Sequence, residues 1–235
     1  MASMLDLHAT VRAAVEAGGT AAFDADGTLW ADDIGESFLR ELEREALLPA
    51  GSWRRYEERL ARDPVDAYGW AVTAMAGLEE RLVRERAAAF FRDHFARRLF
   101  PAMRELVEAL VAAEVRVAIV SASNRWLIEA AARALRVHHA AGVAVEVVEG
   151  RLSDRLVLPL PAEEGKVEWA LRMLGGPPAL AVGNGAIDLH LLQAAAHRLV
   201  ICPAEDPDTP LAREGRAAGW TVLPLDHPCR EAHLP

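Results

Sequence analysis

The sequence predicts an α/β protein in which a parallel sheet carries helices on both faces and a helical segment is inserted into it. Two observations support this prediction. Short apolar runs alternate with helical stretches in residues 1–31 and again in residues 100–235, and this alternation is typical of a parallel, Rossmann-like sheet buried on both sides. Between these parts, residues 32–99 show one helical pattern after another and no apolar run suited to a strand.

The expected elements of the sheet region follow in a regular order. An amphipathic helix over about Leu5–Glu16 ends at Gly18-Gly19, and the first strand follows it. Four further buried strands and two helices are predicted: strands at Val115–Val120, Val143–Val148, Ala179–Val182 and Leu199–Cys202, and helices at Arg125–Leu135, capped by Ser123, and at Lys166–Leu174. Ligands of such a sheet bind beyond the carboxyl ends of its strands.

Capping residues define the helices of the inserted segment. Ser52 can cap one helix, Asp63-Pro64 places a cap before a first-turn proline, and Gly77 closes the next helix before a long helix at Leu78–Leu99. We therefore predict a core domain of residues 1–31 and 100–235 and a helical cap domain of residues 32–99. The alternative is a helical hairpin that serves only as structure.

The connections between these two domains are expected near Trp30–Asp33 and Leu99–Pro101. Hinge closure there would exclude water from a site at the sheet edge. The C-terminal stretch Leu223–Pro235 is rich in proline and histidine and is expected to be loose.

Composition limits the function classes. The chain has 235 residues, of which 52% are hydrophobic, and its formal net charge is −9. This charge disfavours nucleic acid as a partner, because binding to a phosphate backbone needs clustered Lys and Arg. Cys202 and Cys229 lack metal-ligand spacing and are expected to be free thiols in a reducing compartment. No leader pattern or membrane-spanning stretch is evident, so we expect a soluble cytoplasmic protein; the oligomeric state is left open.

Two carboxylates lie at the end of the first predicted strand, in Phe23-Asp24-Ala25-Asp26-Gly27-Thr28. Where a strand ends and the chain turns, Asp24 and Asp26 can both face one ligand beyond the sheet. One carboxylate can attack phosphorus, and a second can transfer the proton of the leaving group. The structural alternative is an Asp-Gly hairpin turn. It accounts for Asp26 but not for Asp24.

This segment resembles the first motif of the haloacid dehalogenase superfamily, whose phosphatase branch carries both aspartates. Three further matches follow in the order of that family: Ser121 in Val-Ala-Ile-Val-Ser-Ala-Ser, Lys166 in Glu-Glu-Gly-Lys-Val, and Asp188 in Val-Gly-Asn-Gly-Ala-Ile-Asp. The resemblance spans Asp24–Asp188. Members similar to phosphoserine phosphatase carry a helical cap between the first and second motifs, which is where the predicted insertion lies.

The resemblance implies a role for each matching residue. Asp24 would be the nucleophile and a ligand of Mg²⁺, while Asp26 would be the acid/base and would ligate the ion through its backbone carbonyl. Ser121 and the backbone N–H of Ala122 would bind phosphoryl oxygens. Lys166 would neutralise charge on the transferring group. Taken alone, Ser121 could be a helix cap and Lys166 an ordinary surface lysine.

Asn184 departs from the family pattern, because family phosphatases usually have an acidic metal ligand at this position. An amide oxygen can ligate Mg²⁺ but brings no charge, so metal binding should be weaker. Asp188 could ligate the metal through water or orient Lys166. Its structural alternative is a cap at the start of the next helix.

The substrate is expected to be a small phosphorylated metabolite. Asp33 lies where phosphoserine phosphatases read the ammonium of the substrate, and Glu36 follows one helical turn later; both could equally be a solvated helix start. Trp30, Trp53 and Trp70 could form an aromatic wall for an organic cation. The Ser121-Ala122-Ser123 segment replaces the Ser-Gly-Gly of phosphoserine enzymes, which puts serine itself in doubt.

Arg125 is near enough to the second motif to be a weak candidate for phosphate binding. Taken together, the residues and the resemblance predict a Mg²⁺-dependent phosphomonoesterase that works through an aspartyl-phosphate and acts on a small phosphorylated metabolite, with an amino-acid or amino-alcohol phosphate as one candidate. Two alternatives remain open. One is a phosphotransferase, and the other is a catalytically weak ligand-binding or regulatory protein.

Overall fold

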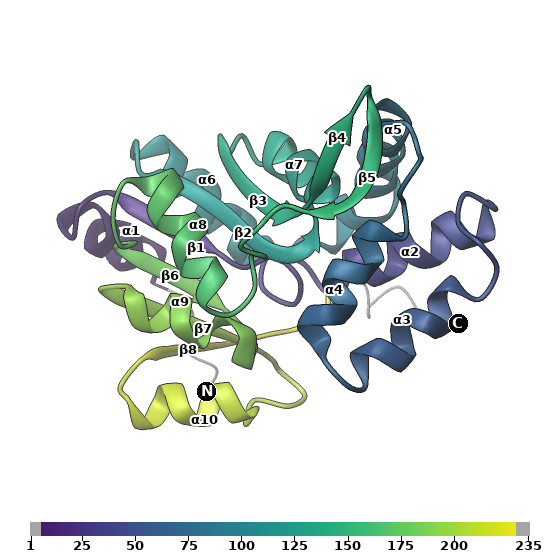
Figure 1. Ribbon diagram of the computed structural model, residues 1–235. Coiled ribbons are helices and arrows are strands. Elements are labelled where there is room, and N and C mark those ends of the chain that lie inside the picture. Colours follow the sequence, from purple (N-terminus) through teal and green to yellow (C-terminus); the bar gives the residue numbers. More distant parts are fainter. Residues whose placement is uncertain (1–5, 229–235) are drawn as a thin grey trace.

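The computed structural model describes residues 6–228, and it contains a six-stranded sheet with helices on both faces (Figure 1). The strand order is β3-β2-β1-β6-β7-β8, and every neighbouring pair is parallel. The strands are β1 Thr20–Phe23, β2 Arg116–Asn124, β3 His139–Val143, β6 Leu180–Gly183, β7 His197–Pro203 and β8 Thr221–Leu225. This arrangement confirms the predicted α/β class with a Rossmann-like parallel core.

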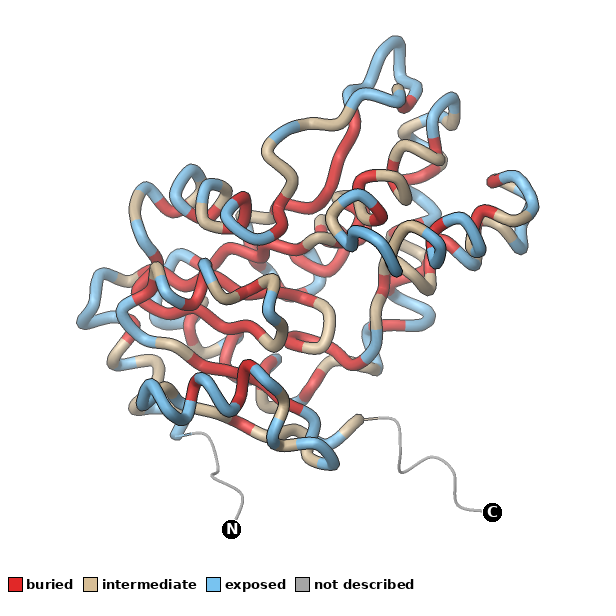
Figure 2. Tube along the Cα trace, turned by 60° about the horizontal axis from the view of Figure 1, so that its bottom comes forward, coloured by how far each residue is buried: buried red, intermediate tan, exposed pale blue. Residues whose placement is uncertain are grey.

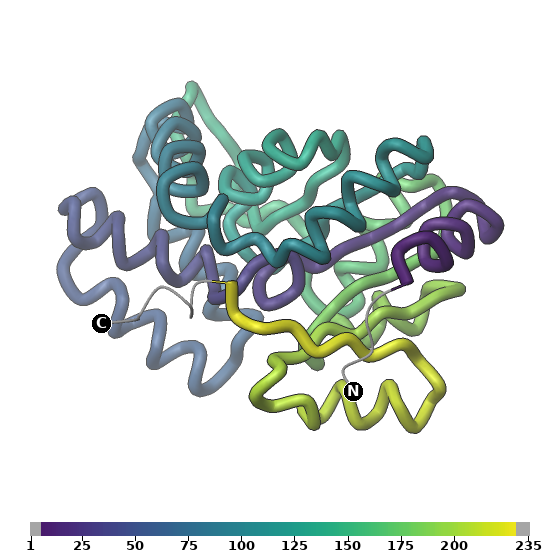
Figure 3. The backbone as a smooth tube through the Cα atoms, turned by 180° about the vertical axis from the view of Figure 1, so that it is seen from behind, coloured from purple at the N-terminus to yellow at the C-terminus, as the bar shows by residue number. Residues whose placement is uncertain are grey.

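Side-chain alternation along the strands divides the core into two layers. Phe23, Ile119 and Val182 belong to one buried cluster, whereas Ala22 and Ala118 point into the other. The first layer is covered by α1 Leu7–Glu16, α6 Pro101–Ala112 and α7 Arg125–Ala134, and the second by α8 Glu164–Leu174, α9 Leu189–Ala194 and α10 Pro210–Ala217. Figure 2 shows the resulting buried centre, and Figure 3 shows α1 and α6 from behind.

The chain between β1 and α6 is helical, as expected. Its elements are α2 Ile34–Arg44, α3 Ser52–Leu60, α4 Pro64–Thr73, α5 Glu80–Phe90, the π-helix η1 Phe91–Phe95 and the 3₁₀-helix η2 Ala96–Arg98. The side chain of Asp63 caps α4 by accepting from the N–H groups of Val65 and Asp66. The single long helix predicted at Leu78–Leu99 is wrong in its second half, where the helical winding changes twice before Leu99. The domain boundaries themselves stay a prediction.

The two connections of this helical segment run side by side. Trp30 forms a β-bridge with Leu99, and the N–H of Phe100 donates to the carbonyl of Leu29 over 3.0 Å. Arg98 and Asp32 form an ion pair of 2.6 Å across the same junction. The segment therefore leaves and rejoins the sheet region at one place.

A β-hairpin replaces the strand predicted at Val143–Val148. β3 ends at Val143, and β4 Val145–Val148 pairs antiparallel with β5 Arg151–Leu156 outside the main sheet. The run looked buried because it is apolar, but Val147 and Val148 are exposed. The hairpin supports the helical segment, since the N–H of Gly77 donates to Leu152 and the N–H of Leu152 donates to Leu78.

The C-terminal prediction is also partly wrong. Leu223 belongs to the sheet strand β8, which pairs with β7, so the chain is ordered where it was expected to be loose. The rest of that stretch beyond Pro228, including Cys229, lies outside the described residues. Cys202 is a buried free thiol. Among residues 6–228, no helix is long and apolar enough to cross a membrane.

Candidate active site

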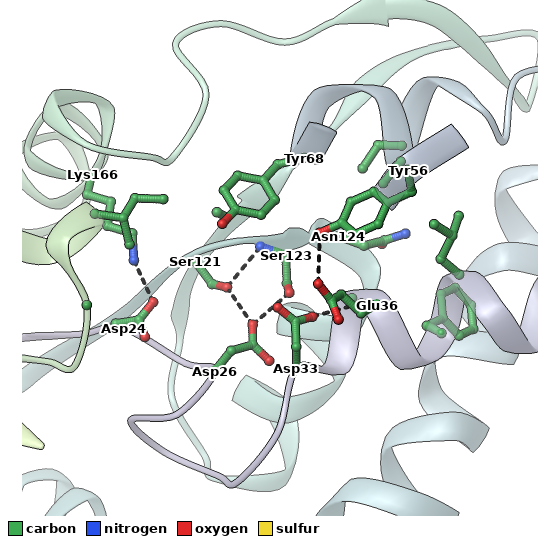
Figure 4. A pocket seen from close by; sticks show the side chains of 18 of the residues that line it. Asp24, Asp26, Asp33, Glu36, Tyr56, Tyr68, Ser121, Ser123, Asn124 and Lys166 are labelled. Carbon is green, nitrogen blue, oxygen red and sulfur yellow. Dashed lines mark hydrogen bonds and ion pairs between the residues drawn. The ribbon is translucent and has the colours of Figure 1, made fainter. Parts of the chain in front are cut away.

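A cavity of about 210 Å³ lies between the carboxyl edge of the sheet and helices α2 to α4 (Figure 4). The strand order reverses between β1 and β6, which is where open α/β sheets bind ligands. The cavity brings together most of the residues predicted for the site: Asp24, Asp26, Asp33, Glu36, Ser121, Ala122, Lys166 and Asn184.

Asp24 follows the last residue of β1 and is held at the sheet edge. Its N–H donates to the carbonyl of Val182 on β6 over 2.9 Å, so it continues the strand pairing by one residue. The chain then turns at Gly27, whose φ is 72° and where a Cβ would overlap with the side chain of Asn184. Glycine is therefore required there both for the backbone conformation and for space. The next residue, Thr28, donates from Oγ1 to Oδ2 of Asp24 over 3.0 Å.

Lys166 links two carboxylates. Its Nζ donates to Oδ1 of Asp24 and to Oδ1 of Asp188, each over 2.5 Å, and the side chains of Lys166 and Asp188 are fully buried. The other oxygen of Asp188 accepts from the N–H groups of Asn184 and Gly185 over 2.9 and 3.0 Å. Asp188 thus orients Lys166 and the loop after β6, which is one of the two roles expected for it.

Burial and neighbouring charges shift the pKa values of Asp24 and Lys166. Burial and the charge of Asp188 raise the pKa of Asp24 to about 7, although Lys166 opposes the shift. For Lys166, burial acts to lower the pKa, but the carboxylates of Asp188 and Asp24 outweigh it and the net shift is upward. Lys166 therefore stays positively charged beside the predicted nucleophile, where it can balance negative charge.

The carboxylate of Asp26 accepts four hydrogen bonds. Oδ1 accepts from Nε1 of Trp30 over 2.9 Å and from the N–H of Ile34 over 2.7 Å. Oδ2 accepts from Oγ of Ser123 over 2.7 Å and from Oγ of Ser121 over 3.4 Å. Burial raises the pKa of Asp26, and the bonds from Ile34, Ser123 and Trp30 act against that shift.

Two oxygen atoms and one atom of the Asn184 amide converge where the predicted Mg²⁺ would sit. One amide atom of the Asn184 side chain lies 3.1 Å from Oδ2 of Asp24 and 3.1 Å from the carbonyl oxygen of Asp26. If that atom is the amide nitrogen, it donates to both; if it is the oxygen, three acceptors face one another. Ligands at adjacent corners of a Mg²⁺ octahedron, each 2.0–2.1 Å from the ion, are about 2.9 Å apart. The oxygen orientation therefore fits a magnesium site.

Only one of these three groups is a carboxylate, since Asn184 contributes an amide and Asp26 a carbonyl. Within the described part of the chain, no group of three or more His, Cys, Asp or Glu side chains could hold a metal ion.

The last residues of β2 present hydroxyl and backbone groups to the cavity. Ser121 is buried, and its Oγ accepts from the N–H of Ser123 over 3.0 Å. Asn124, not Ser123, caps α7, because its side chain accepts from the N–H of Trp126. The prediction that Ser123 caps α7 is therefore wrong. Its hydroxyl instead donates to Oδ2 of Asp26.

The helical side of the cavity is acidic, phenolic and apolar. Asp33 caps α2 by accepting from the N–H of Glu36, and it also lines the cavity. Glu36 accepts from Oη of Tyr56 over 3.4 Å, and Tyr68 lies nearby (Figure 4). Burial and the charge of Asp26 raise the pKa of Asp33 well above its usual range. Apolar neighbours complete this side: Phe38, Leu39, Leu42, Ala71, Val72 and Met75.

Some expectations fail in the structure. Arg125 does not line the cavity, because its guanidinium is bound to Glu129 over 2.6 Å along α7. The three tryptophans proposed as an aromatic wall are not in the lining either. Trp30 is buried behind Asp26, and Trp53 stacks under Arg40. The aromatic residues at the cavity are Phe38 and the only two tyrosines of the chain, Tyr56 and Tyr68. Their rarity was the one sequence signal that could have drawn attention to them.

The fold and this arrangement of Asp24, Asp26 and Lys166 make a candidate active site at the edge of a parallel α/β sheet. The family model of haloacid dehalogenase-like hydrolases matches residues 21–193. The chain belongs to this family, which confirms the resemblance seen in its motifs and the prediction that it is an enzyme.

Two curated relatives come from Mycobacterium tuberculosis. A phosphoserine phosphatase is 29% identical over 179 residues, which are 74% of this chain and 41% of that protein, so the chain spans less than half the length of this relative. A probable phosphatase is 28% identical over 222 residues, covering 88% of this chain and 75% of that protein.

Solved structures share the fold. A protein of unknown function from Bordetella pertussis superposes with a TM-score of 0.76 at 24% identity, covering 87% of this chain and 97% of that one. A probable phosphoserine phosphatase from Vibrio cholerae gives a TM-score of 0.63 at 19% identity, with 87% and 60% of the two chains covered. At these identities the likeness concerns the fold alone.

Proposed function

We propose that the protein is a Mg²⁺-dependent phosphomonoesterase that hydrolyses a small phosphorylated metabolite through an aspartyl-phosphate. The observation that carries the proposal is the grouping of a carboxylate nucleophile, a charged lysine and a second carboxyl around one cavity. Lys166 lies 2.5 Å from Asp24, and the carboxylate of Asp26 faces the same space. A site with these groups can attack phosphorus, balance the charge that develops and supply a proton.

The reaction would proceed in two displacements. In the first, a carboxylate oxygen of Asp24 attacks phosphorus, the bond from phosphorus to the leaving oxygen breaks, and Asp26 gives its proton to that oxygen. In the second, water attacks the phosphorus of the aspartyl-phosphate and loses a proton to Asp26, while the bond to Asp24 breaks and phosphate leaves. Ser121 and the N–H of Ala122 would hold the phosphoryl oxygens during both steps.

Asp24, the carbonyl of Asp26 and Asn184 would hold the magnesium ion. When bound, the ion would neutralise negative charge on Asp24 and on the phosphoryl group. Asp188 would act through Lys166 rather than as a ligand, because Lys166 and two backbone N–H groups already engage both of its oxygens.

The lining of the helical side favours a leaving group that carries an amine. Asp33 and Glu36 supply carboxyl groups there, and a bound ammonium would favour their charged forms. Among the described lining residues, Lys166 is the sole cationic side chain, and it is bound to Asp24 and Asp188. A carboxylate on the substrate would therefore meet no free partner in this lining. We accordingly favour an amino-alcohol phosphate over an amino-acid phosphate.

A phosphate-release screen tests the proposal. The purified protein would be incubated with a panel of phosphorylated metabolites and added Mg²⁺, and inorganic phosphate would be measured. Release from at least one small phosphomonoester, lost on chelation, is the expected result. A parallel screen with added acceptor alcohols distinguishes the phosphotransferase alternative, because transfer would yield a new ester in place of free phosphate. Absence of both products across the panel would favour a non-catalytic binding protein.

A further inference from the structure

The two oxygens of Asp26 lie in chemically different surroundings. Oδ1 is bound by an indole N–H and a peptide N–H, from Trp30 and Ile34. Oδ2 is bound by hydroxyl groups, from Ser123 and Ser121. Figure 4 shows one carboxylate oxygen of Asp26 turned toward both serines. An N–H group of this kind can only donate, whereas a hydroxyl can either donate or accept.

This difference determines where a proton can reside. A proton on Oδ1 would face two donors that cannot accept it, so Oδ1 must remain an acceptor in both ionisation states. A proton on Oδ2 can be donated to Oγ of Ser123, whose hydroxyl then reverses its direction. We infer that Oδ2 of Asp26 is the atom that transfers the proton, and that Trp30 and Ser123 are positioning residues that fix this choice. The inference rests on the phosphomonoesterase function proposed above.

Trp30 is well fixed for such a role. Its side chain is fully buried and packs edge-on against Phe91 and Phe95 of the π-helix, with ring centroids 5.8 and 6.4 Å away. Its backbone forms bridges with Asp26 on one side and Leu99 on the other. The indole N–H is therefore held by both connections of the helical segment, and with it the orientation of the Asp26 carboxylate.

These hydrogen bonds to Oδ1 and Oδ2 of Asp26 account for the path of the proton in both displacements. In the first displacement, Oδ2 releases its proton to the leaving oxygen as the bond to phosphorus breaks, and the Ser123 hydroxyl turns to donate to the new carboxylate. In the second, Oδ2 takes the proton of the attacking water, and Ser123 turns back to accept. Oδ1 keeps its two N–H bonds throughout.

Leaving-group dependence tests the inference. General acid catalysis matters most for a basic leaving group such as an alkoxide and least for p-nitrophenolate. We would measure kcat/KM for p-nitrophenyl phosphate and for ethanolamine phosphate in the wild type, Trp30→Phe and Ser123→Ala. Trp30→Phe removes the indole N–H but keeps an aromatic ring in the core. The matched controls are Trp220→Phe and Ser153→Ala, which lie outside the cavity lining.

Both variants should lose about tenfold or more on ethanolamine phosphate, within the range for general acid catalysis, and little on p-nitrophenyl phosphate. Equal losses on both esters, or no loss on either, would overturn the inference while leaving the phosphatase function intact. If Trp30→Phe does not fold, Ser123→Ala provides the same comparison of kcat/KM between the two esters. A wild type that releases phosphate from no ester of the panel would instead overturn the proposed function, and the inference with it. If ethanolamine phosphate is not hydrolysed, a panel substrate with another alkoxide leaving group takes its place in the comparison.

Discussion

Asn184 gives the candidate metal site its unusual charge. Its side chain reaches the turn after β1, within 3.1 Å of both Asp24 and the carbonyl of Asp26, and Gly27 leaves the space for it. A neutral amide at this position leaves Asp24 as the one charged oxygen donor of the three. We therefore expect weak magnesium binding that a single substitution can strengthen.

Asn184→Asp should lower the Mg²⁺ concentration needed for half-maximal activity by about tenfold, because affinity for hard cations rises with ligand charge. A magnesium titration of phosphate release in both forms measures this. Gln193→Glu on α9 is the control, since it adds the same charge on an exposed face. An unchanged requirement in Asn184→Asp would place Asn184 outside the metal shell.

Asp33 offers a test of the electrostatics through stability. Burial and the charge of Asp26 raise its pKa well above the usual value, so the folded protein holds a proton that the unfolded chain releases as the pH rises. Stability from this group is therefore lost with increasing pH. Without metal, Asp33→Asn should be more stable than the wild type at pH 8, and the difference should shrink toward pH 4.

Thermal unfolding in chelator across this pH range measures the effect, at about 2–4 °C per kcal/mol for a chain of this size. Asparagine caps helices as well as aspartate does, so the cap of α2 is retained. Asp63→Asn makes the same change at the exposed cap of α4 and is the control. If the thermal stabilities of Asp33→Asn and the wild type change in parallel with pH, the pKa of Asp33 is not raised in the folded protein.

At the level of elements, the start of α8 determines where Lys166 lies. Gly165 immediately precedes Lys166, and a Cβ on it would overlap with the carbonyl oxygen of Leu160. Its N–H also donates to the carbonyl of Ala162 over 2.9 Å. The lysine is therefore held by a close backbone approach as well as by its two carboxylates.

Gly165→Ala should destabilise the protein by about 1–3 kcal/mol, the usual cost of overpacking, and reduce kcat by displacing Lys166 from Asp24. Gly176→Ala is the matched control near the other end of α8, because a Cβ there meets no atom within 4 Å. Thermal unfolding and phosphate release would be measured on both. If Gly165→Ala has the same stability and activity as Gly176→Ala, the close approach of Gly165 to the carbonyl of Leu160 does not determine the position of Lys166.

The sequence allowed most elements to be predicted, but not the hairpin or the end of the long helix. The apolar run through Val143–Val148 has the composition of a buried strand, and composition alone does not reveal that the chain leaves the sheet after Val143. In the same way, Phe91–Phe95 continues a helical pattern, while the structure winds it as a π-helix whose Phe91 and Phe95 pack against Trp30. Both features arise from tertiary contacts, which sequence periodicity does not encode.

At the scale of the whole molecule, the cavity lies between the sheet and the helical segment, and its two sides differ in how far their residues could be predicted from the sequence. The core side, with Asp24, Asp26, Ser121 and Lys166, could be predicted because its residues occur in short motifs at strand ends or at a helix start. The helical side could not. Tyr56 and Tyr68 occupy no motif, and their meeting with Asp33 at one cavity depends on how α2, α3 and α4 pack together.

The helical side should make the enzyme selective for cationic leaving groups. We expect ethanolamine phosphate to be hydrolysed with higher kcat/KM than glycerol phosphate, since a buried charge pair is worth about 2–5 kcal/mol when broken. We also expect it to be preferred over phosphoserine, because the carboxylate of phosphoserine would meet no free cationic side chain among the described lining residues. Glu36→Gln should reduce the preference over glycerol phosphate, whereas Glu105→Gln on α6, which is exposed, should not. A wild-type preference for glycerol phosphate, or no change in Glu36→Gln, would contradict this reading of the cavity.

The central claim is that Asp24 is the nucleophile, and the most direct measurement is the mass of the protein after rapid quenching with substrate and Mg²⁺. With p-nitrophenyl phosphate as the substrate, whose leaving group needs little help from an acid, Asp26→Asn should slow the breakdown of the intermediate more than its formation, because water would lack a base. We therefore predict that Asp26→Asn accumulates one phosphoryl group on the peptide containing Asp24, and that Asp24→Asn acquires none and loses turnover. Normal phosphatase activity in Asp24→Asn, or a phosphoryl group on another residue, would contradict the mechanism.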